Sequence, residues 1–166
     1  MSVAIVREYL KQFDKEKDVK EFDVSSATVE LAAEAVGVIP ARIAKSLTFL
    51  SKDETRCYMI LAAGDAKIDN SKYKHFFGLK AKMLTPEQVL AFTGHPIGGV
   101  CPFALPEDGA HVDVYLDESL KRFDTVFPAA GSGASAVTMT CEELEKCSRA
   151  KGWVDLCKGW QEEPVS

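Results

Sequence analysis

Lys45 is the first residue in this sequence whose setting suggests chemistry. It interrupts an otherwise apolar run, and strand alternation would place it on one face with Ile43, Leu47 and Phe49. A lysine on an apolar face is costly unless it lines a cavity or finds a partner. In a cavity, its ammonium group would be a point charge for a carbonyl or phosphate oxygen. Alternatively, the opposite face forms the core and Lys45 is merely exposed among apolar residues.

A glycine-rich and proline-rich stretch over residues 93–103 is the second candidate. Its sequence, TGHPIGGVCPF, predicts a loop with special backbone geometry. Gly98 and Gly99 would let main-chain N–H groups approach a ligand closely, and a tight structural turn is the alternative. The stretch is not a phosphate-binding P-loop, because it lacks the Gly-Lys-Ser/Thr ending.

A run of small residues over 129–136 is the third candidate. Gly131, Ser132 and Gly133 lie between two expected strands and could bring main-chain amides to a ligand. A plain turn is the competing interpretation, because an isolated Gly-x-Gly is weak and no Gly-x-Gly-x-x-Gly follows.

The cysteines and histidines do not form a persuasive site. A cysteine nucleophile needs a histidine base, and Cys101 lies six residues from His95, but closeness in sequence says little about geometry. His75 and His111 are isolated. The five cysteines include no C-x-x-C spacing, so zinc and thioredoxin-type redox sites are poorly supported. We therefore expect no metal, no cofactor and reduced thiols.

Length and composition suit one globular domain over residues 1–166. The net charge is −5, from 20 Lys and Arg against 25 Asp and Glu, which on its own argues against a nucleic-acid binder. No apolar run approaches the roughly 20 residues that a membrane helix needs, and the first residues do not resemble a signal peptide. A cytoplasmic location is expected.

The elements that would position these residues are mixed, without a strict strand–helix–strand rhythm. Apolar spacing predicts helices over residues 3–13, 27–36, 72–77, 86–92 and 141–150. Strands are expected over residues 43–50, 57–62, 111–116, 125–127 and 136–139, the first two forming a hairpin, and residues 14–21 are expected to be a turn or a solvated face. This pattern favours an α/β (α+β) fold with a mixed or antiparallel sheet flanked by helices.

Several helix boundaries carry recognisable capping residues. Ser25 or Ser26 would cap the helix over 27–36, which Gly37 would end. Thr85 would cap the helix over 86–92, and Thr140 the helix over 141–150. These residues predict where the helices begin and end.

In their order and spacing, several segments resemble the YbaK/EbsC family of aminoacyl-tRNA deacylases, which are related to the insertion domain of bacterial prolyl-tRNA synthetase. The segments are residues 32–40, 43–47, 63–65, 84–89, 93–103, 117–120, 130–133 and 140–144. The resemblance covers about residues 23–150. It implies a mixed α/β domain with a curved, barrel-like sheet flanked by helices.

The resemblance also implies roles for individual residues. Lys45 falls on the family's essential lysine, and the stretch from Gly98 to Pro102 falls on a Gly-x-x-x-Pro loop that shapes the substrate pocket. The implied substrate-binding residues are His95, Gly98, Gly99, Val100, Cys101, Pro102, Gly131, Ser132 and Gly133. This chain departs from the family pattern at Cys101 and Ala104, where many relatives carry Ser and Gly, and these changes are expected to alter the polarity of the pocket.

The activity implied by the resemblance is trans-editing, the hydrolysis of the ester that joins a wrong amino acid to tRNA. Cysteine or alanine on proline tRNA is the expected substrate, with the substrate's own thiol or a positioned water attacking the carbonyl. An aminoacyl ester is already activated, so precise binding can replace a strong protein nucleophile. The alternatives are a non-hydrolytic module that binds tRNA or a synthetase, and a hydrolase of other activated acyl esters.

One segment is positively charged although the net charge of the chain is negative. Residues 67–82 hold five lysines against one aspartate, a local charge of +4 that leaves −9 for the rest of the chain. Lys72, Lys74, Lys80 and Lys82 are therefore candidate contacts for the acceptor end of tRNA, and a solvated helical face is the alternative. Prolyl-tRNA synthetase is a further candidate partner, whereas no membrane and no DNA partner is expected.

Overall fold

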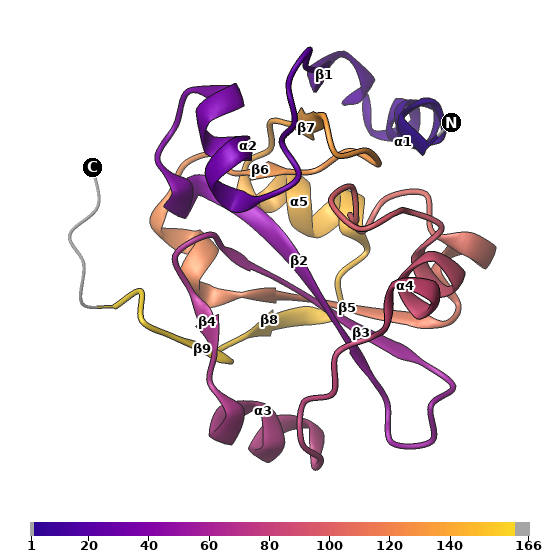
Figure 1. Cartoon of the computed structure of the whole chain (residues 1–166), viewed down its shortest axis with the longest axis vertical. Helices are drawn as coiled ribbons and strands as arrows, with labels where there is room; N and C mark the ends of the chain where they lie inside the picture. Colours follow the sequence, from indigo (N-terminus) through magenta and orange to yellow (C-terminus); the bar gives the residue numbers. More distant parts are fainter. Residues whose placement is uncertain (1, 162–166) are drawn as a thin grey trace.

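The computed structural model describes residues 2–161, and its central element is a five-stranded mixed sheet (Figure 1). In sheet order, the strands are β6 (Phe127–Pro128), β2 (Ile43–Leu50), β3 (Cys57–Ala63), β5 (Val112–Asp117) and β8 (Gly152–Val154). The predicted hairpin of β2 and β3 is antiparallel, and the other three pairs are parallel. The predicted α/β fold with a mixed sheet is confirmed, whereas the expected barrel-like curvature is not.

Helices and two short ribbons surround this sheet. The α-helices are α1 (Ser2–Leu10), α2 (Val29–Val36), α3 (Asn70–Phe77), α4 (Pro86–Thr93) and α5 (Cys141–Ser148). The 3-10 helices are η1 (Lys11–Phe13), η2 (Glu16–Asp18), η3 (Pro40–Arg42), η4 (Pro106–Gly109) and η5 (Glu118–Arg122). The antiparallel ribbons pair β1 (Val19–Glu21) with β7 (Ser135–Val137), and β4 (Lys67–Ile68) with β9 (Cys157–Lys158). Figure 1 shows α2 beside the start of β2 and α3 at the opposite end of the molecule.

The predicted caps hold for three of the helices, and one is wrong. Thr85 and Thr140 each begin a helix with a full capping box, and Gly37 ends α2 in the left-handed conformation. Thr28 caps α2, instead of Ser25 or Ser26, by accepting a hydrogen bond from the Leu31 N–H. The reason is tertiary, because the Ser26 N–H donates to the Gly133 carbonyl at 2.6 Å and holds the chain extended there.

Strands that depend on distant partners were missed. Residues 14–21, expected to be a turn or a solvated face, contain β1, which pairs with β7. The C-terminal β8 and β9 have three and two residues, and each exists because it pairs with β5 or with β4. Such short segments carry too little periodicity to predict a strand by themselves.

Both faces of β2 are packed, so neither face is simply the solvent face. Ala44 and Leu50 belong to the main core, which also contains most of β3 and the buried side of α1. On the other face, Phe49 joins a second cluster that contains Tyr73 of α3. By strand alternation, Lys45 shares the face of Phe49. Within residues 2–161, no helix is long and apolar enough to cross a membrane.

Candidate active site

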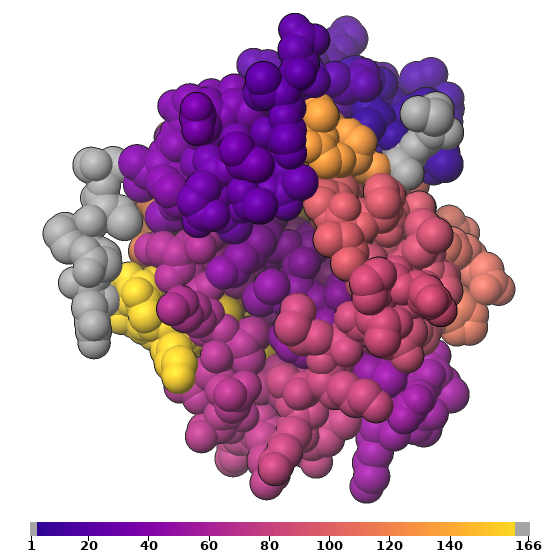
Figure 2. All heavy atoms as spheres, in the orientation of Figure 1, coloured from indigo at the N-terminus to yellow at the C-terminus, as the bar shows by residue number. Residues whose placement is uncertain are grey.

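A cavity of about 240 Å³ opens along β2 and contains Lys45 in its lining. The hollow is visible near the middle of the face in Figure 2, with β2 at its floor. The lining residues are Ser26, Ala27, Thr28, Val29, Ala32, Ile43, Ala44, Lys45, Ser46, Leu47, Thr48, Met83, Leu84, Val89, Ile97, Gly98, Val100, Phe127, Ala129, Ser135 and Ala136. Among the described residues, Lys45 is the one charged residue of this lining, and the walls are mostly apolar.

An unpaired strand edge forms the floor of the cavity. β6 pairs only with Ile43 and Ala44, so the edge of β2 beyond them lacks a strand neighbour until Phe49 bridges to Met83. The Leu50 N–H and the Thr48 carbonyl bond outward to the 82–84 segment, at 2.8 and 3.3 Å. In an antiparallel pair, every second residue directs its main-chain N–H and C=O to the same side of the strand. Those of Ser46 therefore point away from β3, as the outward groups of Thr48 and Leu50 do.

Ser46 contributes two main-chain groups and one buried hydroxyl without a protein partner among the described residues. Within the described chain, its outward N–H and C=O have no backbone partner, and its buried Oγ has no hydrogen bond. Buried polar groups without partners are uncommon in folded proteins and often mark a position that a ligand completes. The floor therefore offers main-chain hydrogen-bonding groups next to Lys45 in the strand, whereas the Ser46 hydroxyl lies on the opposite face of β2 by strand alternation.

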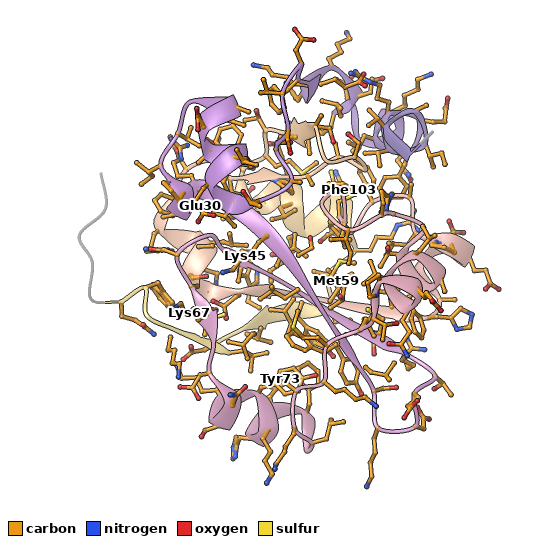
Figure 3. The ribbon with its side chains drawn as sticks, viewed as in Figure 1. Glu30, Lys45, Met59, Lys67, Tyr73 and Phe103 are labelled. Atoms are coloured by element: carbon orange, nitrogen blue, oxygen red, sulfur yellow. The ribbon has the colours of Figure 1, made fainter. Side chains whose placement is uncertain are left out.

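The ammonium group of Lys45 is held in place by the turn that follows β3. Its Nζ donates to the carbonyl oxygens of Gly64, at 3.4 Å, and Ala66, which leaves one of its three N–H groups for another acceptor. Burial lowers the pKa of Lys45, and the negative charges of Cys157 (when ionised), Asp65 and Glu30 act against that effect. Figure 3 shows Glu30 and Lys67 on either side of Lys45.

The glycine-rich loop reaches the cavity through two of its predicted residues. Gly98 and Val100 line the cavity, and Gly98 has the left-handed φ of +94° that glycine favours. Gly99 packs behind them, because a Cβ there would lie 2.5 Å from the Ser132 nitrogen. The Gly131 N–H also donates to the Gly99 carbonyl at 3.1 Å.

The turn of Gly131, Ser132 and Gly133 therefore supports the loop from behind and does not enter the cavity lining. Residues on either side of the turn, Ala129 and Ser135, provide the wall from this segment. The structure brings Lys45, Gly98 and Val100 to one cavity and leaves the glycine turn one layer away.

His95 and Cys101 are also outside the lining. Both are buried, and the His95 Nε2 lies 2.7 Å from the Phe103 carbonyl and 3.5 Å from the Cys101 Sγ. Because a carbonyl only accepts, Nε2 carries the proton and donates to it. Burial lowers the pKa of His95 and raises the pKa of the Cys101 thiol to about 12. This pair supports the loop internally and is not an activated nucleophile.

Pro102 and the four predicted tRNA-contacting lysines lie away from the lining. Pro102 borders a separate cavity of about 250 Å³ beside Tyr9 and Arg149. Lys72 bonds Asp155 at 2.9 Å, and Lys82 lies 3.7 Å from Glu54. Two more, Lys74 and Lys80, are exposed, and neither has an ion pair within the described residues. Their role as tRNA contacts stays a prediction.

Ser46, Met83 and Ile97 line the cavity although the sequence reasoning did not select them. Met83 and Ile97 are large apolar side chains with 66% and 62% of their surface exposed, so they form an apolar rim. Met83 directly follows the lysine-rich segment, and Ile97 lies in the glycine-rich loop, so their sequence positions could have indicated that they line the site. A free strand edge at Ser46, however, depends on the shortness of β6 and is invisible locally.

The arrangement suits the binding of an activated ester. Neither histidine, cysteine nor carboxylate lines the cavity, and residues 2–161 contain no cluster of three such groups that could hold a metal ion. A fixed ammonium group and main-chain donors can stabilise negative charge that develops on a carbonyl oxygen. The apolar walls and the partial burial of Lys45 limit the contact of these groups with water.

Comparisons with known proteins show the family of this chain and its fold. The aminoacyl-tRNA editing domain family matches residues 23–147. The uncharacterized protein YwhH of Bacillus subtilis is 55% identical over 161 residues, which cover 97% of this chain and 100% of that protein. The proline–tRNA ligase of Thermotoga maritima is 32% identical over 116 residues, 69% of this chain but only 19% of the ligase, so this chain spans about a fifth of that enzyme's length. The crystal structure of "a putative trans-editing enzyme for prolyl tRNA synthetase" has a TM-score of 0.83 at 31% identity, covering 95% of this chain and 98% of that one.

Proposed function

The chain belongs to the aminoacyl-tRNA editing domain family, and on this premise we propose that it trans-edits misacylated proline tRNA. As a member of this family it is an aminoacyl-tRNA deacylase. Its substrate in our proposal is cysteine or alanine esterified to proline tRNA. The similarity to proline–tRNA ligase, and to the structure described as a trans-editing enzyme for prolyl tRNA synthetase, supports this choice of tRNA.

The observation that carries the proposal is the isolation of Lys45 as the charged group of an apolar cavity, next to main-chain groups of Ser46 that have no backbone partner in the described chain. The ester carbonyl would lie between these residues, with its oxygen toward the free N–H of Lys45. As the carbonyl becomes tetrahedral, negative charge grows on that oxygen, and a nearby ammonium group stabilises it in a poorly hydrated site.

The hydrolytic step needs no protein nucleophile. Water attacks the carbonyl carbon, the bond from that carbon to the ribose oxygen breaks, and the products are the free amino acid and tRNA with a free hydroxyl. For a cysteine substrate, the side-chain thiol is the alternative attacking group, and water then hydrolyses the cyclic thioester. Both routes require the orientation that a fixed binding site supplies.

Small side chains around the cavity favour a small amino acid. Ala27, Ala32, Ala129 and Ala136 contribute to the walls. In a cavity of about 240 Å³ with such walls, a small side chain fits more readily than a large one. Because one methylene group changes binding by only about 1–3 kcal/mol, such a cavity rejects large amino acids better than it separates alanine from cysteine.

A panel of charged tRNAs tests the proposal. Purified protein should release alanine or cysteine from proline tRNA while leaving correctly charged prolyl-tRNA largely intact. Release of neither amino acid, under conditions in which the tRNA stays bound, would contradict it. Because the described lining lacks a general base, that outcome would favour the second candidate, a non-hydrolytic module that binds tRNA or a synthetase.

A further inference from the structure

The ribbon of β4 and β9 places two lysines directly opposite each other. Lys67 pairs with Lys158, and the next pair is Ile68 with Cys157. Cys157 is fully buried, so strand alternation directs Lys67 and Lys158 to the other face, where both are exposed. Figure 1 shows this ribbon beside the end of the main sheet.

Like charges directly opposite on antiparallel strands repel each other. Within residues 2–161, no carboxylate lies within 4 Å of either ammonium group. Two neighbouring acids are already engaged, because Asp65 bonds Arg122 at 2.6 Å and Asp155 bonds Lys72 at 2.9 Å.

Two further acids lie near the ribbon. Asp117 accepts a hydrogen bond from the Leu156 N–H at 2.9 Å. The pKa of Asp69 is lowered chiefly by hydrogen bonds from the backbone of Lys72 and Ser71, and also by the charge of Lys158. The Asp69 Oδ1 accepts the Ser71 and Lys72 N–H groups at the start of α3, at 3.0 and 3.1 Å. This carboxylate is thus committed to a helix cap. The Lys67–Lys158 pair remains a locally concentrated positive charge without a direct counterion among the described residues.

The pair lies next to the Lys45 end of the cavity. The carbonyl of Ala66, the residue before Lys67, accepts a hydrogen bond from the Lys45 Nζ. The charge of Lys67 is also close enough to be among the causes that lower the pKa of Lys45. Figure 3 shows Lys67 on β4 beside Lys45. A polymer whose end occupies the cavity can therefore reach this ribbon.

We propose that Lys67 and Lys158 together bind a backbone phosphate of the RNA whose 3′ end occupies the cavity. The inference rests on the proposed function, because that function supplies an RNA end beside Lys45. A phosphodiester is the anion that such a chain carries near its terminus, and lysine ammonium groups bind it as point charges. The bound phosphate relieves the repulsion between the two lysines.

Binding of uncharged proline tRNA at several salt concentrations tests the inference. The double variant Lys67→Gln/Lys158→Gln should bind about three- to tenfold more weakly near physiological salt, with the slope of log affinity against log salt smaller by about 1–2. Lys67→Arg/Lys158→Arg should keep most of the affinity. Lys17→Gln/Lys20→Gln is the matched control, because it removes two exposed lysines, one from η2 and one from β1, neither of them ion-paired within residues 2–161. Figure 1 shows β1 well away from the β4–β9 ribbon.

Three results would overturn the inference. The first is an unchanged slope of log affinity against log salt in the Lys67→Gln/Lys158→Gln variant. The second is an equal loss of tRNA affinity in the control variant. The third is a loss of binding to a polyglutamate peptide, but not to tRNA, in the Lys67→Gln/Lys158→Gln variant. The last result would make the pair a protein-docking site. The binding assay uses uncharged tRNA and does not depend on hydrolysis. A wild-type protein that binds tRNA but hydrolyses no aminoacyl-tRNA would therefore contradict the proposed function, and the same binding data would still test the lysine pair.

Discussion

The Nζ of Lys45 donates to the carbonyl of Gly64, 3.4 Å away, across the turn that leaves β3. That turn is tightly packed, because a Cβ at Gly64 would lie 2.0 Å from the Pro40 carbonyl oxygen and 2.6 Å from a Val29 methyl group. The close approach links α2, the chain before β2 and the turn into one unit. The position of the candidate catalytic ammonium group therefore depends on the absence of a side chain at Gly64.

Replacing Gly64 by alanine should damage both stability and activity. The added methyl group collides with backbone, so we expect a loss of about 1–3 kcal/mol in the free energy of unfolding. Deacylation should fall further than stability explains, because Lys45 loses its support. Gly152→Ala is the matched control, since nothing lies within 4 Å of a Cβ there. Equal stability and activity in both variants would contradict the prediction.

Lys45 should make the free energy of unfolding increase with pH in the alkaline range. Burial lowers its pKa in the folded protein below the ordinary value of 10.5, so the unfolded chain binds this proton more tightly. Stability then rises with pH between the folded and unfolded pKa values. The wild-type protein should gain free energy of unfolding relative to Lys45→Met as pH approaches 10.5. Denaturant unfolding of both proteins between pH 7 and 10.5 measures this, and a parallel pH dependence would argue against it.

Cys101 should be dispensable for chemistry. Its thiol is fully buried with a pKa raised to about 12, and it does not line the cavity. Cys101→Ala should therefore keep kcat within a few-fold of wild type while losing about 1 kcal/mol of stability. Steady-state deacylation and thermal unfolding check both points. A loss of activity of 100-fold or more in a folded variant would assign Cys101 a role that this geometry does not support.

Val100 should limit the size of the amino acid. It lines the cavity from the glycine-rich loop, and shortening it to alanine removes two methyl groups from the wall. Val100→Ala should raise kcat/KM for an amino acid larger than alanine by about 10–200-fold relative to alanine itself. Val38→Ala, which lies outside the cavity lining, provides the control. An identical preference in the wild-type and Val100→Ala proteins would remove Val100 from the account of specificity.

Local patterns predicted the central hairpin and several caps well. The apolar run from Ile43 to Leu50 became β2 with those bounds, and Thr85 with Gln88 began α4 as a capping box does. Thr28 was missed as the cap of α2, because a main-chain bond between Ser26 and Gly133 decides where the extended chain ends. The β8 and β9 strands were missed for the same kind of reason.

The candidate site was predictable only in part. The odd position of Lys45 in an apolar strand and the glycines around Gly98 are local signals, and the family resemblance pointed to the same residues. Ser46 was not predictable, because its unpaired edge arises from how little of β2 the short β6 covers. The burial of His95 and Cys101 likewise depends on packing around Phe103 that sequence spacing does not reveal.

The central claim is tested most directly by comparing the wild type with Lys45→Ala. The measurement is the hydrolysis of proline tRNA that carries alanine or cysteine. Far-ultraviolet circular dichroism and thermal unfolding establish that the variant folds, and tRNA binding establishes that it still reaches the substrate. The account predicts release by the wild type and a loss of at least about 100-fold in kcat for the variant, the size expected when a donor to a developing oxyanion is removed. Full activity in folded Lys45→Ala would contradict it.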